Sequence, residues 1–130
     1  MISFDKMGNW LDEIAEQFPQ EFYNDLNGGI LLLPEAREDP EFPPGEIYIL
    51  GEYCHDQMGR YINMYYGSFA ALFPDLNDDQ LYDKLYNTLS HEFTHHMESL
   101  AGERSLEIKD AVELARYRAD LAERERNDPE

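Results

Sequence analysis

Basic residues and cysteine are scarce in this sequence. Its 130 residues include 10 lysines and arginines against 28 aspartates and glutamates, which gives a formal net charge of −18 at pH 7. A surface this acidic repels the phosphates of nucleic acids and the headgroups of anionic membranes, so we expect neither as a partner. Because Cys54 is the only cysteine, an intrachain disulfide and a four-cysteine structural zinc site are both excluded.

The sequence also lacks long apolar runs and internal repeats. No stretch approaches the roughly 20 apolar residues that span a bilayer, and the first residues carry no basic segment followed by an apolar one. We therefore expect a cytoplasmic protein. With 42% hydrophobic residues, the chain predicts a single domain, residues 1–130, whose charged tail frays from about residue 123.

Helical periodicity marks both ends of the chain, and short strands are expected between them. The first part of the chain predicts a helix from Ser3 to about Gln17 and a short helix after Pro19. The middle predicts a strand at 30–33, a surface loop at 34–46, and strands at 47–53 and 60–66 joined as a hairpin. One or two helical turns at 68–73 are followed by a long helix from about Asn77 to Ala101, stopped by Gly102, and by a last helix to about Ala122. Strands in the middle with helices on either side predict the α+β class.

The long predicted helix contains the sequence His91-Glu92-Phe93-Thr94-His95. Histidines four residues apart on a helix lie one turn apart on one face, where both imidazoles can bind one metal ion. This H-E-x-x-H spacing is typical of sites in which two histidines bind zinc and the glutamate acts as general base. The sequence therefore predicts His91 and His95 as zinc ligands and Glu92 as the general base.

The same helix separates its apolar residues from the two histidines. At about 100° per residue, its apolar positions fall into one arc of roughly 140°. These positions are Leu81, Tyr82, Leu85, Tyr86, Leu89, Phe93 and Leu100. His91, His95 and Glu98 lie on the far side, within about 60° of one another. His96 falls inside the apolar arc and is predicted to be a core histidine rather than a ligand.

A catalytic zinc site takes a third protein ligand, and three carboxylates compete for that position. Glu103 follows Gly102, where a sharp reversal of the chain would turn it towards the metal. Glu98 shares the face of the two histidines, and its side chain leans back towards them. Glu107 would return from the start of the last helix. Glu103 is the preferred candidate, and Glu98 and Glu107 are the alternatives.

With these features, the chain resembles the minimal zincin-like metallopeptidase family of small bacterial proteins. The likeness rests on the helix beginning Ser3-Phe4, the hairpin ending in the segment 65–69 (Tyr-Tyr-Gly-Ser-Phe), and the motif from His91 to His96. It implies a small sheet packed on helices, with the motif helix forming the floor of a cleft. Many members resemble H-E-x-x-H-x-x-G-x-x-D, with the aspartate as third ligand. Here Ala101 stands at the aspartate position and cannot bind zinc.

Two functions from different classes follow from the motif. The first is a zinc-dependent metallopeptidase, in which metal-activated water hydrolyses a peptide bond of a peptide or protein substrate and Glu92 takes the water's proton. The alternative is a non-catalytic zincin-like domain that binds a partner protein or a structural metal. The unassigned third ligand motivates the alternative.

Overall fold

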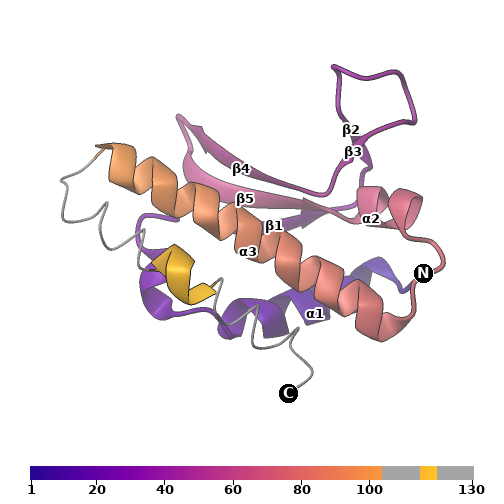
Figure 1. Ribbon diagram of the computed structural model, residues 1–130, viewed down its shortest axis with the longest axis horizontal. Helices are drawn as coiled ribbons and strands as arrows, with labels where there is room; N and C mark the ends of the chain where they lie inside the picture. Colours follow the sequence, from indigo (N-terminus) through magenta and orange to yellow (C-terminus); the bar gives the residue numbers. More distant parts are fainter. Residues whose placement is uncertain (104–114, 120–130) are drawn as a thin grey trace. The chain divides into compact units, whose positions relative to one another are not determined.

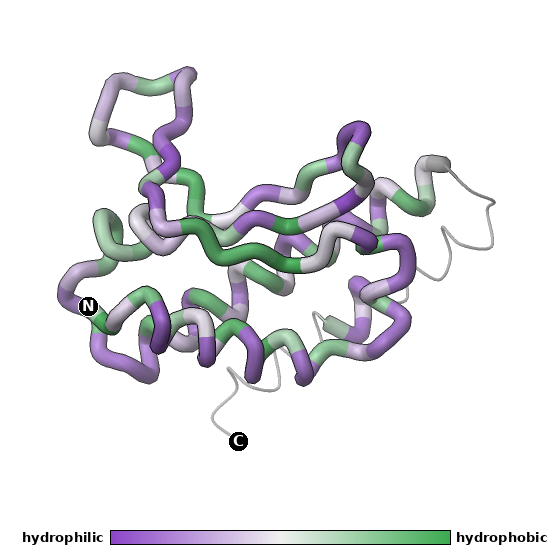
Figure 2. The backbone as a smooth tube through the Cα atoms, turned by 180° about the vertical axis from the view of Figure 1, so that it is seen from behind, coloured by the Kyte–Doolittle hydropathy of each residue, from purple (hydrophilic) through white to green (hydrophobic). Residues whose placement is uncertain are grey.

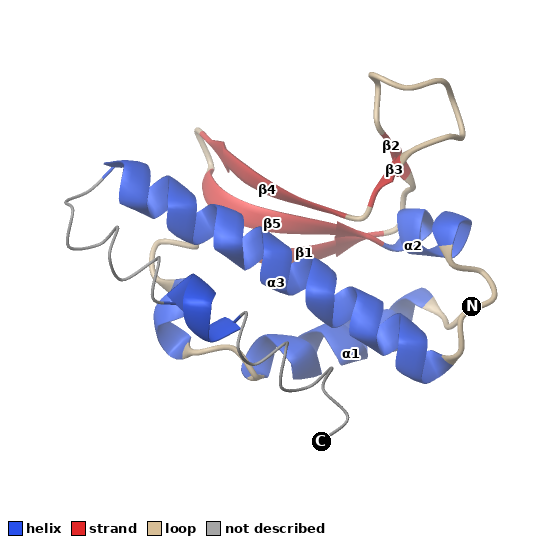
Figure 3. Cartoon of the chain, viewed as in Figure 1, coloured by secondary structure: helices blue, strands red, loops and turns tan. Residues whose placement is uncertain are grey.

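The computed structural model of the protein describes residues 1–103 and 115–119. The chain divides into two compact units, Met1–Phe93 and Thr94–Glu130, and the boundary falls inside the longest helix. Helices and a small sheet make up the first unit, which confirms the predicted α+β class (Figure 3). None of the described helices is long and apolar enough to cross a membrane. The tail predicted to fray from about residue 123 lies outside the described residues.

Three strands form the main sheet in the order β1–β5–β4. β1 (Gly29–Leu33) runs parallel to β5 (Gly59–Tyr65), and β4 (Gly51–Asp56) pairs antiparallel with β5, which confirms the predicted hairpin. Figure 2 shows β1 as a nearly continuous hydrophobic run. A second sheet of two short strands, β2 (Arg37–Glu38) and β3 (Tyr48–Ile49), lies at the base of a projecting loop (Figure 1).

Three predicted elements between Pro19 and residue 53 differ from the structure. The strand expected at 47–53 is two strands, β3 and β4, because β3 pairs with β2 whereas β4 pairs with β5. The surface loop expected at 34–46 contains the strand β2, because residues 37 and 38 pair with β3. The short helix expected after Pro19 is a single 3₁₀ turn, η1 (Gln20–Tyr23). These segments are too short for their apolar periodicity to distinguish strand, turn and loop.

Helix α1 (Phe4–Glu16) lies below the sheet in Figure 3, and α3 (Asp78–Glu103) contributes residues up to Phe93 to the same core. The short α2 (Tyr66–Leu72) follows directly on β5. α1 begins as predicted, because Ser3 Oγ accepts a hydrogen bond from the Lys6 backbone N–H at 3.1 Å. The core of the first unit combines apolar residues from these helices with residues from β5 and the segment after η1. Its members are Met7, Leu11, Ile14, Leu26, Ile62, Met64, Phe69, Leu81, Leu85, Leu89 and Phe93.

α3 begins with a reciprocal pair of hydrogen bonds between Asn77 and Gln80. The Asn77 backbone N–H donates to Gln80 Oε1 at 3.1 Å, and the Gln80 backbone N–H donates to Asn77 Oδ1 at 2.9 Å. This is the predicted capping box, which satisfies backbone donors that the first helical turn leaves without partners. Local sequence therefore determines where the motif helix starts.

Replacing Asn77 by alanine should lower the free energy of unfolding by about 1 kcal/mol, because the Gln80 backbone N–H then loses its side-chain acceptor. Urea denaturation followed by circular dichroism measures the change. The matched control is Asn9→Ala at an exposed position inside α1, where no loss is expected because alanine is the better helix former. Equal losses in the two variants would contradict the capping role of Asn77.

The far end of α3 differs from the prediction. Gly102 is helical, and the structure describes the helix as far as Glu103. A glycine ends a helix by taking a left-handed conformation, and Gly102 is not among the glycines with positive φ. The reversal expected at Gly102 is therefore not found. Of the predicted last helix, residues 115–119 are helical, and the other residues assigned to it lie outside the described part of the chain.

Candidate metal centre

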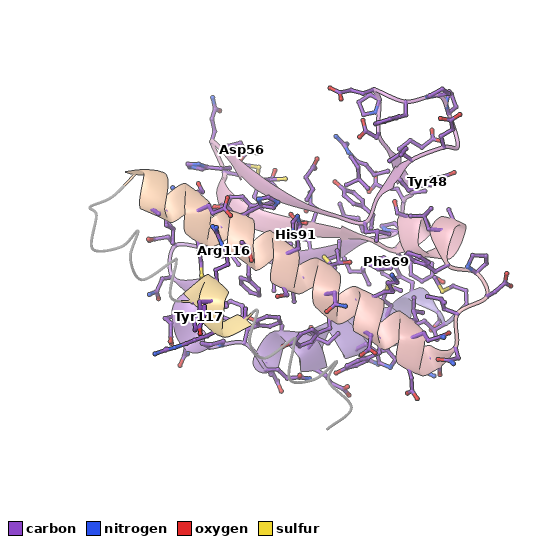
Figure 4. All side chains as sticks on the ribbon, viewed as in Figure 1. Tyr48, Asp56, Phe69, His91, Arg116 and Tyr117 are labelled. Atoms are coloured by element: carbon purple, nitrogen blue, oxygen red, sulfur yellow. The ribbon has the colours of Figure 1, made fainter. Side chains whose placement is uncertain are left out.

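The two predicted zinc ligands lie one turn apart on α3, and both are exposed. Figure 4 labels His91 midway along this helix. Glu98 is exposed as well, whereas Leu85, Leu89 and the other apolar residues of the predicted arc are buried or partly buried. The predicted separation between the apolar residues and the two histidines is confirmed. Two imidazoles at this spacing fit two of the positions around a zinc ion.

Glu92 differs from the histidines on either side of it because it is buried, with 6% of its surface exposed. A Cβ atom placed on Gly51, the first residue of β4, would lie 3.2 Å from Glu92 Cγ and 2.9 Å from Thr88 Cγ2. The start of β4 therefore lies directly against the side-chain stem of Glu92. Burying a carboxylate is costly unless the group is partnered.

The sequence analysis did not predict the burial of Glu92, although at about 100° per residue Glu92 falls inside the apolar arc of the helix, as His96 does. It also did not single out Gly51 or Thr88. A signal for Gly51 was available, because a glycine inside a predicted strand often marks a close approach of another segment. His96 is fully buried, which confirms its predicted place in the interior.

The three carboxylates predicted as third ligands have different positions. Glu98 Oε1 accepts a hydrogen bond from Arg116 Nη2 at 2.6 Å, and Figure 4 labels Arg116 on the helical segment 115–119. Glu103 is the last described residue of α3, about 12 Å beyond His95 along the helix axis because the helix continues through Gly102. Glu107 lies outside the described residues.

Among the side chains that the structure describes, no group of three or more His, Cys, Asp or Glu is arranged to hold a metal ion. The continued helix removes the reversal on which the preference for Glu103 depended. The third ligand therefore stays a prediction with three candidates, and Glu98 would have to exchange Arg116 for the metal.

Cys54 lies on β4, and Cys54 Sγ donates to Glu52 Oε1 at 3.6 Å. Burial raises the pKa of the Cys54 thiol above its ordinary value, and the negative charge of Glu52 raises it further. The thiolate is the nucleophilic form of cysteine, and a raised pKa lowers its population at neutral pH. The arrangement is that of an unreactive thiol rather than a nucleophile.

Iodoacetamide should therefore alkylate Cys54 more slowly at pH 8 than it alkylates an unstructured cysteine peptide. Glu52→Gln should increase the rate, because loss of the carboxylate charge lowers the pKa of the thiol. Mass spectrometry of quenched samples gives both rates, with Glu38→Gln on β2 as the control variant. Alkylation of the wild type as fast as the peptide would contradict the assignment.

No protein-family model matches the sequence, and a comparison with curated proteins gives no match. Among solved structures, the chain is similar to a conserved hypothetical protein from "Thermo thermophilus", with a TM-score of 0.69 and 28% sequence identity. The similarity covers 78% of this chain and 100% of that one. Because that protein is described as hypothetical, the likeness bears on the fold and not on an activity.

Proposed function

We propose that this protein is a cytoplasmic zinc-dependent peptidase related to the minimal zincins. The observation that carries the proposal is the pairing of two exposed histidines, one turn apart on α3, with a buried carboxylate at the residue after the first of them. His91 and His95 would hold the zinc, and Glu98, Glu103 or Glu107 would complete its ligands. Zinc, when bound, polarises a carbonyl and acidifies water at such a site.

Glu92 is the proposed general base. Its carboxylate would take a proton from the attacking water and deliver it to the leaving amine. Two features of its surroundings support this role. The residue is largely shielded from bulk water, and its stem lies against Gly51 and one turn beyond Thr88, so its direction is restricted. A base with a restricted direction loses little freedom when the substrate arrives.

The edge of the main sheet supports a peptide as the substrate. Within the part of the chain that the structure describes, β4 is an outer strand whose only neighbour is β5. Such an edge presents backbone N–H and C=O groups that can pair with an extended peptide. Because β4 starts at Gly51, a peptide paired with it would run past Glu92.

The proposal is tested by zinc content and peptide hydrolysis together. Protein purified without metal-affinity steps should contain about one zinc ion per chain and should cleave members of a peptide library. Chelation should abolish cleavage, and added zinc should restore it. A zinc content far below one per chain, or cleavage that survives chelation, would rule the proposal out.

A non-catalytic zincin-like domain is the second candidate. The pairing of Glu98 with Arg116 favours it, as does the lack of a three-ligand group among the described residues. This candidate predicts that the protein binds zinc or a partner protein but cleaves no member of the library. His91→Ala should then leave partner binding unchanged, whereas the peptidase should lose its zinc and its activity.

A further inference from the structure

We propose that Gly51 is a positioning residue for Glu92. This inference rests on the proposed function, in which Glu92 is the general base. Gly51 is the first residue of β4, on a different element from the H-E-x-x-H sequence. It acts by having no side chain, because the backbone of β4 then approaches α3 closely enough to contact the stem of Glu92.

The approach at Gly51 leaves no room for a methyl group. A Cβ atom at this position would lie 2.9 Å from Thr88 Cγ2, 3.1 Å from Met64 Sδ and 3.2 Å from Glu92 Cγ. Ordinary contacts of this kind begin at about 3.4 Å. Gly51 does not have a positive φ, so alanine could adopt its backbone conformation and the restriction is one of space alone.

Thr88 cannot easily move out of the way. Thr88 Oγ1 donates a hydrogen bond to the Lys84 carbonyl at 2.7 Å, and β-branched side chains have few alternative rotamers on a helix. That hydrogen bond keeps Thr88 Cγ2 directed at Gly51. Glu92 lies one turn after Thr88, and long helical side chains lean towards the N-terminus of their helix. The stem of Glu92 therefore lies near Thr88 where β4 approaches, and Gly51 restricts it from the side of the sheet.

The variant Gly51→Ala should displace α3 or the Glu92 side chain by about half an ångström, because the gap to Thr88 must open to an ordinary contact. A general base misplaced by about 1 Å loses up to a hundredfold in rate, so we expect kcat to fall about tenfold. KM should change less than kcat, and the zinc content should be unchanged. The second change Thr88→Ser removes the contacting methyl group but keeps the hydroxyl, so the double variant should recover most of the lost kcat.

Gly8→Ala is the matched control, because a Cβ at Gly8 would make an ordinary contact of 3.9 Å with Leu32 Cδ2. It should keep kcat and KM at wild-type values. Thr88→Ser alone should also resemble the wild type. A structural role of Gly51 without positioning would lower stability in Gly51→Ala but leave kcat unchanged, which would overturn the inference.

Crystal structures of the wild type, Gly51→Ala and the double variant provide a readout that does not depend on activity. The Glu92 carboxyl carbon should move in Gly51→Ala and return in the double variant. If Glu92 keeps its wild-type position in Gly51→Ala, the positioning role is wrong even in an active peptidase. If the wild type cleaves no peptide, the proposed function fails, whereas a displacement reversed by Thr88→Ser would still support the role of Gly51.

Discussion

Glu92→Gln should reduce peptide hydrolysis by roughly 10²–10⁴-fold, the range that a positioned general base supplies. Glutamine has nearly the size and shape of glutamate, so the contact of the stem with Gly51 should persist. The substitution removes the group that accepts the proton. Because His91 and His95 remain in place, the zinc content should not change.

Initial rates on the best peptide of the library, measured with the zinc content of the same samples, test this expectation. Glu13→Gln is the matched control, because Glu13 is an exposed residue of α1 and the chemical change is identical. Its rate should stay within about twofold of the wild type, as expected for an exposed site away from the chemistry. Hydrolysis retained in Glu92→Gln would show that another group, or a contaminating enzyme, takes the proton.

Phe93→Ala should lower the free energy of unfolding by about 3–5 kcal/mol. Phe93 is 1% exposed, and its ring centroid lies 4.9 Å from that of Phe18, 5.7 Å from that of Phe22 and 5.1 Å from that of Tyr23. Truncation would remove the ring at the centre of this aromatic group and leave a cavity. Because Phe93 follows Glu92 directly, the same segment would supply the proposed base and a large part of the core.

Urea unfolding of Phe93→Ala and Phe42→Ala separates burial from the general effect of losing a phenyl ring. Phe42 lies in the projecting loop between β2 and β3 and is 45% exposed. Its truncation should cost about 1 kcal/mol or less, in line with partly exposed sites. Similar losses in the two variants would mean that Phe93 does not anchor α3 to the core.

The helices could be predicted from the sequence because their signals are local. Ser3 and Asn77 identify the starts of α1 and α3, since each side chain bonds to a backbone group three residues later. The apolar spacing along α3 separates the buried Leu85 and Leu89 from the exposed His91 and His95. Both the candidate ligands and the helix that presents them could therefore be recognised without a structure.

The features that could not be predicted depend on residues far apart in the sequence. The division of one expected strand into β3 and β4 depends on which strand each of them pairs with. The contact of Gly51 with the stem of Glu92 depends on how β4 packs against α3, whereas the burial of Glu92 itself was predictable, because Glu92 falls inside the apolar arc of the helix. At Gly102, a residue that commonly ends helices lies inside one, and the preference for Glu103 as third ligand depended on that predicted end.

Diffraction data collected on both sides of the zinc absorption edge provide the most direct test of the metal centre. Crystals should be grown from protein purified without metal-affinity steps. We predict an anomalous peak about 2 Å from one imidazole nitrogen of His91 and of His95, with a carboxylate oxygen at a similar distance. A peak at other residues, or no peak beside these two histidines after a zinc soak, would contradict the account.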